Sequence, residues 1–105
     1  MRITIAHNRS KAEIIDSIDR SFNEMFQGVP GIPVKLVVQE KGWQGSVLSF
    51  SLSAKLGLLS TPIKGTVEVT DHDLTLDIDL GLLNRLVPEQ TAREVIGSRI
   101  KGLLK

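Results

Sequence analysis

The stretch Val47–Leu80 decides the fold: VLSFSLSAKLGLLSTPIKGTVEVTDHDLTLDIDL. Apolar and polar residues alternate along most of it. The apolar sets are Leu48, Phe50, Leu52, then Ile63, Gly65, Val67, Val69, and then Leu74, Leu76, Ile78, Leu80. This period places apolar side chains on one face of a strand and polar side chains on the other, which is typical of antiparallel sheets with one solvated face. The stretch therefore predicts neighbouring antiparallel strands.

Two shorter alternating segments precede this stretch. Arg2–His7 carries Ile3 and Ile5 on one side, and Val34–Val38 carries a further apolar set. Turn-forming residues separate the strands, and we expect tight turns at Lys41-Gly42 and at Asp71-His72-Asp73. The chain therefore contains about five predicted strands.

Two other segments have the helical period. Ser10-Lys11-Ala12-Glu13 reads as a capping box, in which Ser10 Oγ accepts from the N–H of Glu13 and the Glu13 carboxylate reaches back to the N–H of Ser10. We expect the helix that follows to end at Gly28. The C-terminal helix begins near Val87-Pro88, or at a second capping box at Thr91–Glu94. The apolar stripes are Ile14, Ile15, Ile18, Phe22, Met25, Phe26 and Ala92, Val95, Ile96, Ile100, Leu103, Leu104.

Two glycines interrupt the C-terminal helix. Gly97 and Gly102 each weaken it by about 1 kcal/mol relative to alanine. A structural reason for them would be close approach of the helix to the sheet.

The predicted order is strand, helix, four strands, helix. Single apolar stripes on two helices and a single apolar face on the sheet predict an α+β fold of two layers, with both helices on one face of an antiparallel sheet of about five strands. Residues 1–105 form one domain, since 105 residues leave no room for a second core.

Composition narrows the function classes. The net charge of +1 predicts no basic nucleic-acid face. The chain has no cysteine, which excludes disulfides, thiolate catalysis and cysteine-ligated metal. The N-terminus lacks the apolar run of a signal peptide, and no stretch approaches the roughly 18 uncharged apolar residues of a membrane span. We therefore expect a cytoplasmic protein with no transmembrane segment.

A catalytic constellation is not visible in the sequence. His72 lies in an expected polar turn, and Asp77 and Asp79 share a polar strand face with threonine, lysine and glutamate. Carboxylate pairs act in catalysis when one is desolvated, which this face does not favour. No spaced set of histidine and carboxylate residues converges on a metal. We expect no catalytic residue, no cofactor and no metal.

Two features are less ordinary. Trp43 is the only tryptophan, and it either packs over the edge of the core or serves as an amphipathic contact residue. The tetrapeptide Leu56–Leu59 is repeated at Leu80–Leu83, and both copies follow strands that end at the same end of an antiparallel meander. These leucines either close the end of the core or form an exposed apolar rim. The expected contact residues are Trp43, Leu56, Leu58, Leu59, Leu82, Leu83 and Leu86.

The chain resembles the polyhydroxyalkanoic acid system family, small bacterial proteins associated with polyester storage granules. The resemblance rests on the opening strand with its Ser-capped helix and on the C-terminal helix, together with Trp43-x-Gly45-x-x-Leu48-x-Phe50, Gly57, Pro62–Val69 and Leu76-x-Ile78-x-Leu80. A Leu-Pro pair associated with the end of the last strand is Leu80-Gly81 here. The topology is also similar to a reduced helix-grip domain.

The resemblance implies a non-enzymatic accessory protein of a polyhydroxyalkanoate system, located at granules. It would contact a hydrophobic polymer, lipid or protein surface. The helix-grip similarity implies an alternative, a module that binds a small hydrophobic ligand in a cavity between sheet and C-terminal helix. That cavity would be lined by Phe50, Leu76, Ile78, Ile96 and Ile100. An edge strand, Arg2–Ala6 or Val34–Val38, could also pair across a twofold axis and give a homodimer.

Overall fold

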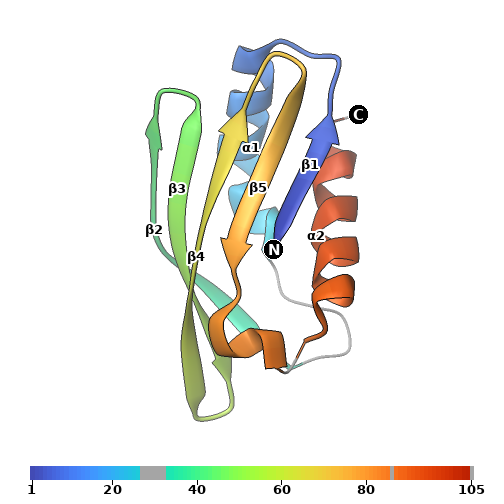
Figure 1. Cartoon of the computed structure of the whole chain (residues 1–105). Helices are drawn as coiled ribbons and strands as arrows, with labels where there is room; N and C mark the ends of the chain where they lie inside the picture. The colour runs from blue at the N-terminus through green and yellow to red at the C-terminus, as the bar shows by residue number, and fades with distance from the viewer. Residues whose placement is uncertain (27–32, 86, 105) are drawn as a thin grey trace.

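The computed structural model describes residues 1–26, 33–85 and 87–104 (Figure 1). Its elements are β1 (Arg2–Ala6), α1 (Lys11–Met25), β2 (Lys35–Gln44), β3 (Val47–Leu56), β4 (Leu59–Val69), β5 (Asp73–Asp79), the 3-10 helix η1 (Gly81–Arg85) and α2 (Glu89–Leu103). The predicted order of strands and helices is confirmed, and η1 is an addition that the sequence patterns did not predict.

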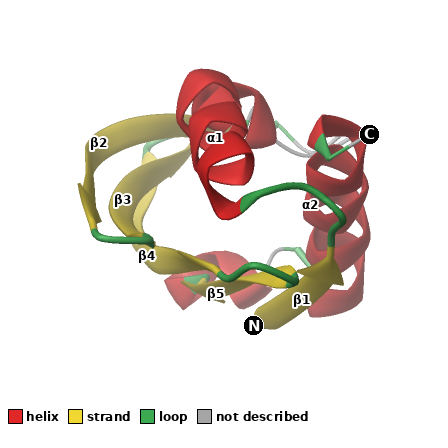
Figure 2. Ribbon diagram, turned by 90° about the horizontal axis from the view of Figure 1, so that it is seen from above, coloured by secondary structure: helices red, strands yellow, loops and turns green. Residues whose placement is uncertain are grey.

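The strands form one antiparallel sheet of five strands in the order β1-β5-β4-β3-β2. β1 pairs only with β5 and is one edge of the sheet, and β2 is the other edge. The sheet is curved, and both helices lie on its inner side (Figure 2). α1 crosses this side and α2 lies alongside β1. The two-layer α+β prediction is thus confirmed.

The core lies between the helices and the inner sheet face. The alternating apolar residues of β3, β4 and β5 are buried there, as are Ile14, Ile18, Phe22 and Met25 of α1. Three phenylalanines form its centre, since the ring centroids of Phe22, Phe26 and Phe50 lie 5.1–5.2 Å from one another. The rings meet at tilted or edge-on angles, which aromatic pairs favour.

The turn between β2 and β3 is not where the sequence analysis placed it. Lys41 and Gly42 lie inside β2, paired with Phe50 and Ser49. The prediction of a tight turn at Lys41-Gly42 is wrong; the chain turns at Gly45-Ser46 instead, where Gly45 has a φ of +63°. Tight hairpin turns need a positive φ, which glycine adopts without steric cost.

A β-bulge at Gln39 explains the longer strand. The pairing of β2 with β3 shifts between Val38 and Glu40, so that Val38 pairs with Leu52 and Lys41 pairs with Phe50. An extra residue reverses the alternation beyond it. Lys41 and Trp43 therefore share the inner face with Val38, although the simple alternation rule would place them on the opposite face.

The helix termini follow the predicted caps in part. Ser10 Oγ accepts from Glu13 N at 3.2 Å, as predicted, but the Glu13 carboxylate accepts from Ser10 Oγ at 3.1 Å rather than from the backbone of Ser10. α1 ends at Met25, and the predicted stop at Gly28 lies outside the described residues. Pro88 is the N-cap of α2, so the start at Pro88 is confirmed and the alternative at Thr91 is wrong.

The turn between β4 and β5 lies at Asp71-His72 as predicted, but Asp73, the third residue of the predicted turn, is the first residue of β5. Thr70 organises it, since Thr70 Oγ1 accepts from the N–H groups of His72 and Asp73 at 3.2 and 3.0 Å. His7 joins this turn to β1: its backbone N–H donates to His72 O at 2.9 Å, and its ring Nε2 lies 2.8 Å from Thr70 O. β1 ends one residue earlier than the predicted Arg2–His7 segment.

Candidate functional site: an apolar corner at the end of the sheet

The hairpin of β3 and β4 extends beyond β5 and β1, and β2 accompanies it as far as Lys35, which pairs with Lys55 (Figure 1). β3 pairs with β4 as far as Leu56 and Leu59, whereas β5 pairs with β4 only from Lys64 onward. The inner side of this projecting end lies beyond the helices, and η1 packs against it. Leu82 N, in η1, donates to Thr61 Oγ1 of β4 at 3.3 Å.

This arrangement brings the two Leu-Gly-Leu-Leu copies together, as the sequence analysis predicted. We name Leu56, Leu58, Leu59 and Leu82 the leucine corner. Together with Val34, Ala54, Ser60 and Thr61, three of these leucines (Leu56, Leu59 and Leu82) line a small hollow of about 70 Å³. The hollow is almost entirely apolar, and it opens between the hairpin and η1.

Some of these apolar residues close the end of the core, and others form an exposed apolar rim. Leu80 is 7% exposed and Val87 is 1% exposed, so these two close the end of the core. Leu58 is fully exposed at 106%, Leu59 is 69% exposed and Leu82 is 61% exposed. They are the exposed large hydrophobic side chains of the described residues. An exposed set of this kind is a candidate contact surface, because exposed apolar patches mark interaction sites.

Basic residues flank the leucine corner. Lys35 of β2 pairs with Lys55 of β3, and Lys55 pairs with Ser60 of β4. Both lysines are exposed, and no ion pair joins either of them to another residue within the described ranges. Lys55 alternates with Ala54 and Leu56, which line the hollow, so the two lysines place positive charge on the opposite face of this end of the sheet.

The other predicted contact residues do not extend this surface. Trp43 lies near the opposite end of β2, paired with Leu48, and is half-buried. Its indole Nε1 donates to Asp19 Oδ1 of α1 at 3.1 Å, so it packs over the edge of the core. The side chain of Leu83 and the whole of Leu86 lie outside the described residues.

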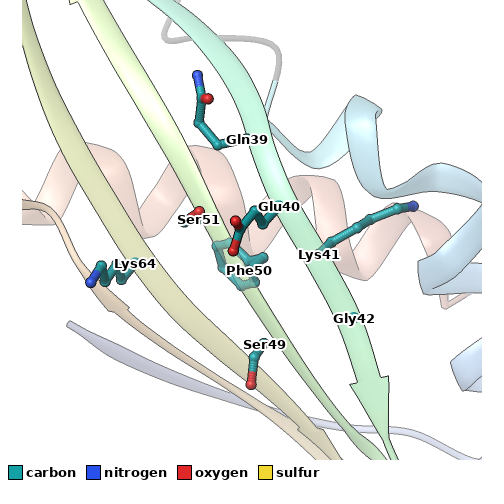
Figure 3. A pocket seen from close by; sticks show the side chains of 8 residues that line it. All are labelled: Gln39, Glu40, Lys41, Gly42, Ser49, Phe50, Ser51 and Lys64. Carbon is teal, nitrogen blue, oxygen red and sulfur yellow. The ribbon is translucent and has the colours of Figure 1, made fainter.

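The residues predicted to line a ligand cavity are all buried in the core. Phe50, Leu76, Ile78, Ile96 and Ile100 are at most 9% exposed. Phe50 also borders an open depression of about 760 Å³ over β2, β3 and β4 (Figure 3). The ligand cavity stays a prediction, and the structure places these side chains against one another.

That depression displays the polar sheet face. Glu40, Ser49, Ser51 and Lys64 surround it, while Lys41 extends away from it toward α1 (Figure 3). The depression is lined by the carboxylate of Glu40, the ammonium group of Lys64 and the serine hydroxyls, and no histidine lines it that could act as a base. The arrangement lacks the nucleophile and base pair that acyl transfer needs.

The two aspartates of β5 are held by structural contacts. Asp77 Oδ2 accepts from Arg2 Nη2 at 3.3 Å, and Asp79 Oδ1 accepts from the N–H of Gly81 at 3.0 Å. His72 is exposed in its turn. Within the described residues, no three histidine or carboxylate side chains are grouped as metal ligands would be, and no helix is long and apolar enough to cross a membrane.

Comparisons with protein-family models, with curated proteins and with solved structures gave no match to this chain. The resemblance to the polyhydroxyalkanoic acid system family therefore stays a prediction from the residues.

Proposed function

We propose that the protein is a non-enzymatic accessory protein that attaches to a hydrophobic surface through the leucine corner. The observation that carries the proposal is the complete exposure of Leu58 at the tip of a projecting hairpin. A large apolar side chain at such a tip contributes nothing to the core, and it can enter an apolar surface without unfolding the domain.

Leu59 and Leu82 strengthen this attachment. Full burial of a leucine side chain is worth about 1.5–3 kcal/mol, so joint burial of the exposed leucines supports association. Lys35 and Lys55 stand behind the tip and favour a surface with negative charge. The resemblance points to a storage polyester as the surface, with a granule-bound location in the cytoplasm.

A sedimentation experiment tests the proposal. Polyhydroxyalkanoate granules, anionic liposomes and buffer alone are each mixed with the protein and centrifuged. We expect the protein to sediment with the granules and the variant Leu58→Asp to stay in the supernatant. Leu58 makes no buried contact, so this variant keeps its fold, which circular dichroism checks.

The matched control is Gln44→Asp, which places the same charge at the opposite hairpin. This variant should bind granules as the wild type does. Equal binding by wild type and Leu58→Asp, or equal loss in both variants, would contradict the role of the leucine corner. Preference for liposomes over granules would assign the surface to lipid and contradict the polyester.

The ligand-binding alternative has its own measurement. Mass spectrometry of the protein purified under native conditions would detect a bound small hydrophobic molecule. The tight burial of Leu76, Ile78 and Ile100 favours the attachment proposal over this alternative. A stoichiometric bound ligand would reverse that order.

A further inference from the structure

The free edge of β1 exposes hydrogen-bonding groups of the backbone. The N-terminal amino group of Met1 donates a hydrogen bond to Ile78 O at 2.9 Å, and the N–H of Ile78 donates to Met1 O at 2.8 Å. The N–H of His7 donates to His72 O. Hydrogen-bonded pairs recur at every second residue of an antiparallel ladder. The backbone N–H and C=O groups of Ile3 and Ile5 therefore also point toward β5. The backbone N–H and C=O groups of the alternate residues, Thr4 among them, therefore point away from the sheet.

A groove runs along this edge. It measures about 660 Å³ and lies between β1 and α2. Both elements run in the same direction, side by side (Figure 1). The residues that line it are Ile3, Thr4, Ile5, Arg93, Glu94, Gly97, Ser98, Lys101 and Gly102. An edge strand beside a helix is the geometry in which a bound peptide adds to a sheet as a further strand.

The glycines of α2 leave this groove open. Close approach to the sheet is the wrong explanation for them, because a Cβ at Gly97 or Gly102 would have no neighbour within 4 Å. Each glycine costs the helix about 1 kcal/mol, and no contact among the described residues requires it. The space at Gly97 and Gly102 is part of the groove.

The charges in the groove are mainly positive. Arg93 and Lys101 stand one helical turn before and after Gly97, since residues four apart share a face of a helix. Arg93 Nη1 donates to the outward carbonyl of Arg2 at 2.6 Å, which fixes the guanidinium at one end of the groove. Lys101 is exposed at the other end. The one acidic lining residue, Glu94, already accepts from Gln90 at 2.9 Å.

We propose that the groove binds an extended acidic peptide segment, which adds to β1 as an edge strand. Thr4 and Ala6 would bond its backbone, and Arg93 and Lys101 would each bind a carboxylate. The two basic residues are separated by about 12 Å along the helix axis, at about 1.5 Å per residue. Four residues of a strand span about 13 Å. The favoured segment therefore carries acidic side chains at its first and fifth positions, with residues of high β-propensity between them.

A second copy of this chain fits the edge less well. The segment Arg2–Arg9 contains no acidic residue, so a second β1 would offer no carboxylate to Arg93 and Lys101. Each copy would also bring its own α2 into the same space. Charge complementarity thus favours an acidic peptide, and the attachment function of the leucine corner is independent of it.

The test uses a synthetic peptide with glutamates at the first and fifth positions and valine and threonine between them. Its binding to the ¹⁵N-labelled full chain is followed by nuclear magnetic resonance. We expect the amide signals of Thr4, Ala6 and Gly97 to shift and the amide exchange of Thr4 to slow. A peptide with lysines in place of the glutamates, and one with a central proline, should bind at least tenfold more weakly.

Two variants locate the site. Gly97→Leu places a large side chain in the groove, so peptide binding should be lost. Leucine is also a better helix former than glycine, so the melting temperature should stay the same or rise. Lys101→Glu should weaken binding at least tenfold, and the matched charge change Lys64→Glu, at an exposed lysine outside the groove, should leave it unchanged. Unchanged binding by Gly97→Leu, shifts confined to other strands, no shift at millimolar peptide, or a dimer through β1 in light scattering would each overturn the proposal.

Discussion

The ring of Phe50 covers Gly65 on the neighbouring strand, and the strand has no room for a side chain there. A Cβ at Gly65 would lie 2.5 Å from Phe50 Cζ and 2.8 Å from the carbonyl oxygen of Asp77. The first contact can be relieved by movement of the ring, but the second involves the backbone of β5. The glycine thus lets the phenylalanine cluster rest directly on the sheet.

This relationship predicts that Gly65→Ala destabilises the fold. We expect its free energy of unfolding to fall by about 1–3 kcal/mol, the usual cost of overpacking. Urea denaturation measures the change. The control is Gly42→Ala on β2, where a Cβ meets nothing within 4 Å and the change should stay within about 0.5 kcal/mol. Equal losses in the two variants would contradict the steric explanation.

Trp43 and Asp19 should be energetically coupled. The indole N–H donates to Asp19 Oδ1 at 3.1 Å, and this bond joins the edge strand β2 to α1. A double-mutant cycle of Trp43→Phe and Asp19→Ala should give a coupling of about 0.5–1.5 kcal/mol in unfolding free energy. Asp16, which pairs with Arg20, supplies the comparison: Asp16→Ala should be additive with Trp43→Phe. Additivity in both cycles would show that the bond does not contribute.

Substitution of His7 should lower the free energy of unfolding, and substitution of His72 should leave it nearly unchanged. Nε2 of His7 lies 2.8 Å from Thr70 O and Nδ1 accepts from the N–H of Arg9 at 3.2 Å, an arrangement that assigns the ring proton to Nε2. His7→Phe removes both ring nitrogens and leaves Thr70 O and the N–H of Arg9 without these hydrogen bonds, so we expect a loss of about 1–3 kcal/mol in unfolding free energy. His72→Phe changes an exposed turn residue and should stay within about 0.5 kcal/mol. Thermal or urea unfolding of both variants checks the difference.

Leu80 and Leu58, which come from the two Leu-Gly-Leu-Leu copies, should respond differently to truncation. Leu80 is 7% exposed, so Leu80→Ala should lower the free energy of unfolding by about 2–5 kcal/mol. Leu58→Ala should change it by less than about 0.5 kcal/mol, because the side chain has no buried area to lose. Chemical denaturation of the two variants gives both values. A large loss from Leu58→Ala would assign this residue to the core and weaken its role in attachment.

Much of the fold was predictable because its signals are local. The alternation in β3, β4 and β5 identifies the strands and their buried faces, and the Ser10 cap locates the start of α1. These features depend on residues within one turn or a few positions of each other. The convergence of the leucines at one end also followed from strand order in a meander.

The bulge at Gln39 was not predictable in the same way. It moves Lys41 and Trp43 to the inner face, where Lys41 Nζ lies 5.2 Å from the centre of the Phe22 ring. Lys41-Gly42 has the composition of a turn, and only its pairing with β3 makes it strand. The Gly45-Ser46 turn carried a usable signal, since a glycine in a two-residue loop is typical of hairpins.

The sequence by itself determined the elements, the faces of the strands and the absence of cysteine chemistry, because side-chain period and residue type act locally. Only the tertiary structure decided which leucines are exposed, which edge of the sheet is free and what the glycines of α2 leave open. Exposure of a leucine depends on which distant segment covers it: Leu80 is buried by the packed core, whereas nothing among the described residues covers Leu58. Burial of this kind is set by contacts far apart in the chain, and no local pattern encodes it.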